Sequence, residues 1–162
     1  MLNRYLIAAA FFACATCIAQ EPAPASPKFY KLEFVVKELS AGKVTNSRSY
    51  VTIGQAEHSN QSIRTGDKVP VSTGGGGFTY IDVGVNIDVT DIAQAGNDLR
   101  MHVTADISSA EKDPGLPNPI IRQTRWSSNV VLPLKRATVL FSSDSTGSKS
   151  QTQLELTATM LQ

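Results

Sequence analysis

Residues 79–90, with the sequence TYIDVGVNIDVT, alternate regularly between aliphatic side chains and polar residues or glycine. The aliphatic positions are Ile81, Val83, Val85, Ile87 and Val89. Successive side chains of a β-strand point to opposite faces, whereas an α-helix would scatter these five around its axis. The stretch therefore predicts a long strand with one buried face and one polar face, as is typical of an antiparallel sheet.

The same alternation recurs along the chain and predicts seven or eight strands with no convincing helix. We expect a first hairpin from a strand that begins at Phe29 and a second at residues 44–53, joined by a turn at residues 40–43 in which Gly42 can adopt positive φ. Residues 78–90 and 99–108 have apolar faces of matching length and should pair as a second hairpin. Further strands are expected at 120–132, 137–142 and 151–160. The fold class is thus all-β, a single antiparallel β-sandwich or sheet domain.

The region before this long strand is less regular. Two short strand pieces, one at Ile63-Arg64 and one at Lys68-Val69-Pro70-Val71, are expected about a turn at residues 65–67. Pro70 has no N–H, so the second piece should lie at a sheet edge or a bulge. Gly74–Gly77 should form a hairpin loop, since a phosphate-binding loop would be followed by a helix and a lysine.

The N-terminus has the layout of a secretory signal peptide. Arg4 precedes an apolar run over residues 6–18, and small residues lead to a cut after Ala19. A retained anchor is the alternative, and the residues before Cys14 and Cys17 fit lipid attachment poorly. We therefore divide the chain into three parts: a signal peptide at 1–19, a proline-rich linker at 20–28 and the all-β domain at 29–162.

Composition narrows the partners of the exported part. Both cysteines fall within the signal, so the remainder has no disulfide and no thiolate ligand or nucleophile. Only one of the 15 basic residues, Arg4, lies in the signal, which leaves 14 basic and 14 acidic residues. A formal net charge of zero argues against nucleic acid or an anionic membrane surface as the partner. No later apolar stretch is long enough to be a membrane-spanning helix.

Residues that could carry catalysis are sparse. His58 is expected in a loop and His102 on a polar strand face, with no nucleophile or carboxylate at a fixed offset from either. Asp82, Asn86 and Asp88 share one strand face and could suggest calcium, but a strand places residues four apart roughly 13 Å from each other. We therefore expect no metal, no cofactor and no enzymatic activity.

Several short motifs resemble the secretin domain of bacterial type II and type III secretion channels. The strongest are the segments Arg64–Val71 and Tyr80–Ile87, which resemble the secretins' "VPV" edge and their tyrosine-aspartate-valine-glycine strand. Similar stretches follow at Leu99–Ser109, Ile121–Thr124 and Leu154–Thr159. The resemblance spans about residues 64–160, although the double glycine that secretins usually show after the strand at residues 139–143 is absent.

The resemblance implies a secretin-like β fold and an address in the cell envelope, at the periplasm or outer-membrane periphery. It does not imply a channel, because this chain is too short for the ring domains and gate of a secretin pore. We expect a non-enzymatic assembly or protein-binding module that binds a partner along the edge formed by Lys68, Val69, Pro70 and Val71. The resemblance makes a component of a secretion or pilus system the expected partner. The alternative is an exported small-ligand-binding protein or hydrolase with a site built from loops.

Overall fold

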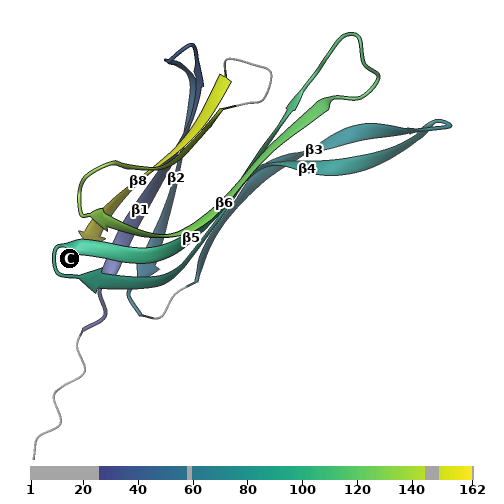
Figure 1. Cartoon of the computed structure of the whole chain (residues 1–162). Coiled ribbons are helices and arrows are strands. Elements are labelled where there is room, and N and C mark those ends of the chain that lie inside the picture. Colours follow the sequence, from purple (N-terminus) through teal and green to yellow (C-terminus); the bar gives the residue numbers. More distant parts are fainter. Residues whose placement is uncertain (1–25, 58–59, 145–149, 162) are drawn as a thin grey trace, which may run out of the picture.

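The computed structural model describes residues 26–57, 60–144 and 150–161, and these residues form an all-β domain (Figure 1). Eight antiparallel strands make two four-stranded sheets, which confirms the predicted fold class. The strands are β1 Phe29–Ser40, β2 Lys43–Gln55, β3 Gln61–Gly74, β4 Gly77–Ala95, β5 Asp98–Glu111, β6 Ile120–Pro133, β7 Thr138–Asp144 and β8 Ser150–Leu161. Their orders are β2-β1-β8-β7 in one sheet and β3-β4-β5-β6 in the other.

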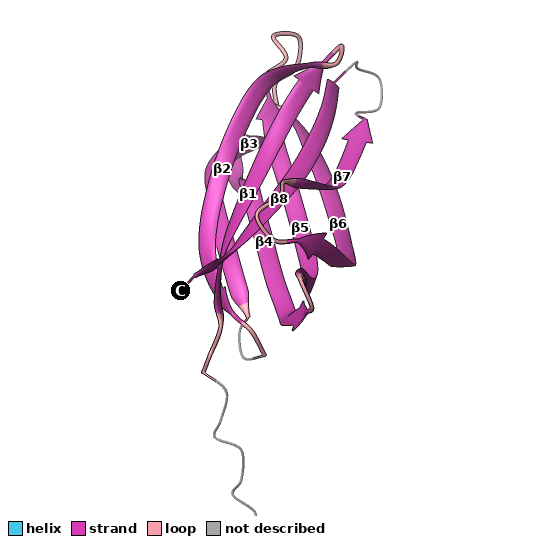
Figure 2. Ribbon diagram, turned by 90° about the vertical axis from the view of Figure 1, so that its left-hand side faces the viewer, coloured by secondary structure: helices cyan, strands magenta, loops and turns pink. Residues whose placement is uncertain are grey.

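The chain crosses between the two sheets twice. It builds the β1–β2 hairpin, runs through β3 to β6 as a meander in the second sheet, and returns so that β8 pairs with β1 (Figure 2). Ala41 and Gly42 close the first hairpin with positive φ, as the sequence predicted for Gly42. β4 and β5 pair about the turn after Ala95, which confirms the second predicted hairpin.

The core lies between the sheets and is made by the inward-facing alternate positions of the strands. Trp126 packs against this core from β6, and its ring stacks on Phe141 of β7 with centroids 5.4 Å apart. The fully enclosed core residues include Tyr30, Leu32, Phe34, Val36, Val85, Ile87, Val89, Leu99, Met101, Val103, Leu132, Leu154 and Leu156.

Two expectations need correction. β3 is one continuous strand rather than two pieces about a turn at residues 65–67, because Gly66 stays in register opposite Gly84 of β4. Ile81 shares the inward face of β4 with four buried aliphatic residues, yet it is 37% exposed. The strand continues past the end of the core, so its alternating pattern does not by itself mark what is buried.

The second sheet forks at the end away from the N-terminus of β1. β4 pairs with β5 only from Val85 onward, and its residues 77–83 pair with β3 alone. Beyond Ile107, β5 in turn pairs only with β6. The sheet therefore splits into two hairpin arms, the β3–β4 arm at residues 67–83 and the β5–β6 arm at residues 108–124, which diverge in Figure 1.

Candidate functional site

The predicted binding edge lies on the outermost strand of the forked sheet. In the part of the chain that the structure describes, β3 pairs with β4 and with no other strand. Lys68, Val69, Pro70 and Val71 all lie on its outer half, in the β3–β4 arm. Strands in this position present unpaired backbone N–H and C=O groups that another strand can bind.

A side chain from the other arm shows which backbone groups face outward. Asn118 accepts a hydrogen bond from the Ser72 N–H at 2.7 Å and donates one to the Ser72 C=O at 3.1 Å. The backbone groups of Ser72 must therefore point away from β4. Because such groups alternate along an antiparallel strand, those of Pro70 and Lys68 also face the open edge, while those of Val69 and Val71 face β4.

Pro70 is consequently compatible with the ladder, since the N–H that it lacks would have pointed outward. Ser72 is already bonded to Asn118, so the open donors of the edge are at Lys68, Gly66 and Arg64. They lie toward the part of the domain in which the two sheets enclose the core, which we call the body. Of the four residues predicted to form the edge, Lys68 is the one whose N–H is directed outward.

Ion pairs line the outer face beside this edge. Lys68 Nζ lies 2.9 Å from Asp82 Oδ1, and Arg64 Nη2 lies 2.6 Å from Asp88 Oδ1, each pair joining β3 to β4. All four side chains are largely exposed, so each pair contributes little to stability, within about 1 kcal/mol. Each pair joins a cation of β3 to a carboxylate of β4, so the pairs add no net charge to this face.

Two glycines and a serine mark the point where the sheet forks. Gly66 and Gly84 lie directly opposite each other, and a Cβ on Gly84 would lie 2.1 Å from the Thr65 carbonyl oxygen. Ser108 Oγ accepts a hydrogen bond from the Gly84 N–H at 3.0 Å. A side chain thus replaces the ladder bond that a continuing β4–β5 pair would make, and the two arms separate beyond it.

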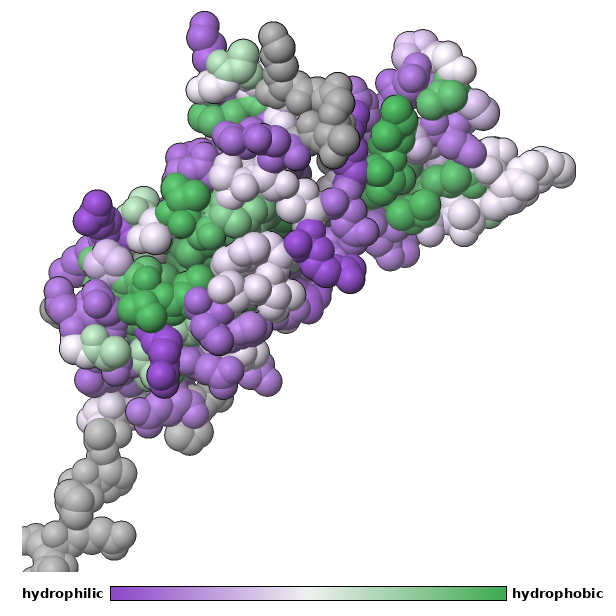
Figure 3. Space-filling model, viewed as in Figure 1, coloured by the Kyte–Doolittle hydropathy of each residue, from purple (hydrophilic) through white to green (hydrophobic). Residues whose placement is uncertain are grey.

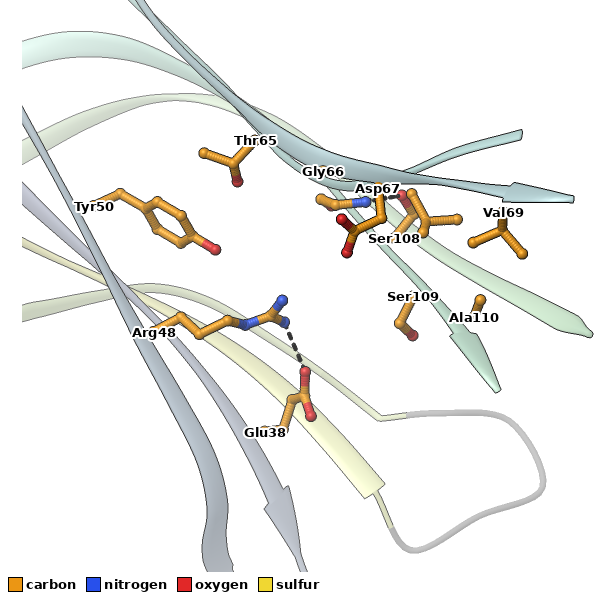
Figure 4. Close-up of a pocket in the computed structure, with 12 residues that line it drawn as sticks. Glu38, Arg48, Tyr50, Thr65, Gly66, Asp67, Val69, Ser108, Ser109 and Ala110 are labelled. Atoms are coloured by element: carbon orange, nitrogen blue, oxygen red, sulfur yellow. Dashed lines mark hydrogen bonds and ion pairs between the residues drawn. The ribbon is translucent and has the colours of Figure 1, made fainter. Parts of the chain in front are cut away.

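A cleft of about 560 Å³ opens between the two sheets at the fork (Figure 4). One wall carries Arg48 and Tyr50 of β2 with Glu38 of β1, and the Arg48 Nη2 lies 2.7 Å from Glu38 Oε1. On the opposite wall Asp67 of β3 and Ser109 of β5 point toward the same space. The walls are polar where the core of the sandwich has ended.

The chemistry of this cleft gives little basis for catalysis. Among the described residues that line it there is no histidine, cysteine or lysine to act as a base or nucleophile. The hydroxyl of Ser108 is engaged by the Gly84 backbone, and the Arg48 guanidinium by Glu38. The Arg48 Nε is buried without a hydrogen-bond partner.

The remaining candidates for chemistry lie apart from the cleft. His102 is on the outer face of β5, where Nδ1 is 3.0 Å from Asn129 Oδ1 and Nε2 is 3.0 Å from Ser127 Oγ. His58 lies outside the described residues. No group of three or more potential metal ligands occurs in the described ranges. Asp82 and Asp88 are each paired with a cation rather than with one another.

One carboxylate, Asp106, and one phenol, Tyr30, are perturbed by their surroundings. Burial raises the pKa of Asp106, but hydrogen bonds from Gln123 and Arg125 and the Arg125 charge outweigh it, so the net pKa lies below its ordinary value. Burial raises the pKa of Tyr30, whose hydroxyl donates to Gln94 Oε1 at 3.0 Å. Asp106 is on the outer face of β5 and Tyr30 is in the core, so neither belongs to a shared reactive site.

Comparison with known proteins yields structural matches only. No family model and no curated protein sequence matches this chain. Among solved structures, the type II secretin GspD from enteropathogenic Escherichia coli has a TM-score of 0.47 at 10% identity, covering 84% of this chain and 67% of that one. The Salmonella SPI-1 injectisome secretin InvG gives 0.48 at 8% identity, covering 84% and 64%.

The Aeromonas hydrophila protein ExeD gives a TM-score of 0.48 at 11% identity, over 83% of this chain and 47% of that chain. The chain therefore spans between about half and two thirds of these proteins. At such values the similarity describes a distant likeness of strand arrangement. It transfers neither the pores nor the assemblies of those proteins to this chain.

Sequence reasoning missed the features that define the fork. The Gly66–Gly84 pair could have been suspected, because glycine inside a strand often marks a close backbone approach. The bonds from Asn118 to Ser72 and from Gly84 to Ser108 had no local signal, since they join residues far apart in the chain. Which side chains line the cleft depends on where the two sheets diverge.

Proposed function

We propose that this chain is an exported, non-enzymatic protein of the cell envelope that binds an extended segment of another protein along β3. The observation that carries the proposal is the open edge of that strand, whose outward N–H groups at Arg64, Gly66 and Lys68 have no strand beside them in the described structure. Strand addition uses main-chain hydrogen bonds for affinity and flanking side chains for selectivity.

The flanking side chains favour a polar partner segment of mixed charge. Arg64 and Lys68 are paired with Asp88 and Asp82 on the outer face, so an incoming strand meets both signs of charge. A uniformly basic segment would be repelled by Arg64 and Lys68, the nearest of these charges, and their paired carboxylates on β4 weaken the attraction for a uniformly acidic one. This pattern agrees with the neutral balance of the chain after residue 19, which gives no attraction to nucleic acid.

We also propose where the protein is located and what kind of partner it binds. A signal peptide cleaved after Ala19 would place the domain in the periplasm or at the outer-membrane periphery. The sequence resemblance of residues 64–160 to secretin domains motivates the narrower proposal that the partner is a component of a secretion or pilus system. No helix in the described ranges has the length and apolar character to cross a membrane.

The test exploits the direction of the backbone groups. Lys68→Pro removes an outward N–H without removing a bond to β4, whereas Lys68→Ala keeps that N–H and removes the same side chain. Each protein, recovered from its own envelope after chemical cross-linking, is analysed by mass spectrometry. We expect one protein adduct on β3 in the wild type, retained in Lys68→Ala and lost in Lys68→Pro.

Equal adducts in all three proteins would show that β3 is not the binding edge. Intact mass of the same samples tests the address, because cleavage after Ala19 gives a defined mass. An uncleaved chain, or lipid on Cys14 or Cys17, would contradict it.

A second candidate function rests on the cleft at the fork. Its polar walls and the partly exposed Arg48 guanidinium suit a small ligand that carries a carboxylate. Asp67 and Glu38 line the same space and oppose an anion, so we rank this function below strand addition. Loss of a bound small molecule in Arg48→Gln, with the protein adduct unchanged, would reverse that order.

A further inference from the structure

The outer part of the β3–β4 arm carries no charge. Residues 69–81 read VPVSTGGGGFTYI, and the two residues that bound this run, Lys68 and Asp82, form an ion pair with each other. A charged pair of exposed side chains thus separates a polar base of the arm from an uncharged end. In most exposed hairpins, charged side chains continue to the turn and keep the edges from associating.

Both faces of this end are apolar. By strand alternation Pro70, Phe78 and Tyr80 lie on the outer face, and the paired residues Val69 and Ile81 lie on the inner face. Phe78 is 66% exposed and Tyr80 65% exposed. An isolated two-stranded ribbon in water has no core of its own. Apolar side chains on both of its faces therefore indicate that another molecule or phase covers both faces.

The neighbouring arm ends in the same way. Residues 114–121, PGLPNPII, are uncharged, and Leu116 is 51% exposed. The two hydrogen bonds between Asn118 and Ser72, one donated by each residue, fasten this loop to the β3–β4 arm. Residues 69–81 and 114–121, which we call the tip, therefore form one unit. Figure 3 shows hydrophobic residues gathered on the arms, separated from those of the body by polar ones.

One edge of the tip has no open backbone donor left. On the open edge of β3 beyond Lys68, Pro70 has no N–H, and Asn118 satisfies both the N–H and the C=O of Ser72. An unsatisfied backbone group is costly where water is scarce. On the other edge of the arm the outward groups of Phe78 and Tyr80 have no strand beside them, because β4 pairs there with β3 alone. Insertion should therefore stop in a layer where water still reaches these groups.

We propose that the tip inserts into the interfacial layer of a lipid bilayer. A groove on a partner protein would cover one face of the ribbon, whereas a lipid layer covers both faces at once. The uncharged strand from Val69 to Thr73 spans roughly 13 Å at about 3.3 Å per residue, enough to enter the interface but well short of the hydrocarbon core, which is about 30 Å thick. Tyr80 provides the amphipathic ring that favours this layer.

The charge pattern also specifies the lipid. The tip has no cation to attract anionic headgroups, and the two cations next to it in sequence, Lys68 and Arg122, are paired with Asp82 and Glu111. Binding should therefore occur on zwitterionic phosphatidylcholine vesicles and change little with salt, in contrast to binding by a basic patch. This inference stands whether or not the β3 edge binds a protein partner.

A fluorescent reporter in the full-length protein tests the insertion. Phe78→Trp places an indole at the tip, and Val131→Trp places one at an exposed position on β6 in the body. With phosphatidylcholine vesicles that carry brominated acyl chains, we expect loss of fluorescence from the Phe78→Trp reporter beyond that of the wild type, which reports on Trp126. The Val131→Trp control should show no additional loss.

A second pair of variants measures the contribution of the aromatic residues. Replacing Phe78 and Tyr80 together by Ser should weaken partition onto the vesicles by roughly tenfold or more, as expected for two large apolar side chains. Replacing Val131 and Val139 by Ser, two exposed residues outside the tip, should leave partition unchanged.

Three results would overturn the proposal. Absence of quenching at Phe78→Trp would show that the tip stays in water, and equal quenching at both positions would indicate nonspecific adsorption. A change of oligomeric state without lipid in the Phe78/Tyr80 variant would assign the tip to contact between protein chains instead.

Discussion

The two halves of β4 show the same alternation of apolar and polar residues, but only one half buries its apolar face. Val85, Ile87 and Val89 are enclosed between the sheets, whereas Ile81, on the same face of the same strand, is exposed on the arm. The change coincides with the loss of pairing to β5 before Val85. A strand pattern therefore predicts which face is apolar, but the neighbouring strands decide how far along the strand that face is covered.

The body ends where the inward-facing residues of neighbouring strands change from apolar to polar at the same height in the sandwich. The inward positions of β1 are apolar up to Val36 and continue with Glu38, and those of β5 are apolar up to Ile107 and continue with Ser109. Val36 pairs with Leu154 of β8, the last buried residue of that strand in this direction. Charged and small inward residues beyond this level prevent close packing, so the sheets diverge and the cleft opens.

The largest expected effect compares the same substitution on the two halves. Val85→Asp places a carboxylate without a partner in the core and should destabilise the domain by several kcal/mol, or prevent folding. Ile81→Asp places it on the exposed arm and should cost less than about 1 kcal/mol. Urea denaturation followed by circular dichroism measures both. Similar midpoints for the two variants would show that the body and the arm are not distinct.

The next effect concerns the junction of the two halves. Gly84→Ala would bring a Cβ against the Thr65 carbonyl and the Gly66 Cα, and we expect a loss of about 1–3 kcal/mol as the strands are forced apart. Gly75→Ala at the hairpin turn meets no atom and changes only a positive φ, so its cost should be about 1 kcal/mol. Thermal unfolding of both variants checks the order, and an equal loss would remove the steric role assigned to the Gly66–Gly84 pair.

Features of the fold that depend on neighbouring residues could be predicted from the sequence, whereas those that depend on distant residues could not. Local patterns found the strands, the β1–β2 turn at Gly42 and the hairpin from 78–90 to 99–108, because each depends on neighbours in sequence. The pairing of β8 with β1 depends on residues more than a hundred positions apart and had no local signal. β3 was divided wrongly because Gly66 usually indicates a turn, and its glycine partner Gly84 could not be located without the register.

The candidate site was predictable to a smaller extent. Pro70 correctly indicated a sheet edge, since its missing N–H excludes a central strand. Alternate residues of β3 direct their backbone N–H groups to the open edge. The sequence could not show that this set includes Lys68 and excludes Val69 and Val71. That direction follows from the contact between Ser72 and Asn118, which joins two hairpins.

The smallest expected effect compares an ion pair of the body with one of the arm. Asp106 of β5 is 20% exposed beside Arg125, and its pKa is lowered because the hydrogen bonds and charge outweigh burial. A carboxyl group with a lowered folded pKa stabilises the protein above its ordinary pKa of 3.8, and this contribution is lost as the pH falls through the folded value. Asp106→Asn should thus destabilise the domain at pH 7, within about 1 kcal/mol since Arg125 is largely exposed.

The difference between wild type and Asp106→Asn should persist from pH 7 to about pH 5 and shrink below pH 3.8. Asp82→Asn on the arm is the matched control: its carboxylate is 79% exposed beside an equally solvated Lys68, so the change at pH 7 should be near zero. Urea midpoints of the three proteins between pH 3 and pH 7 measure both effects. A pH-independent difference for Asp106→Asn would show that its carboxylate acts through packing alone, and body and arm would then not differ in electrostatics.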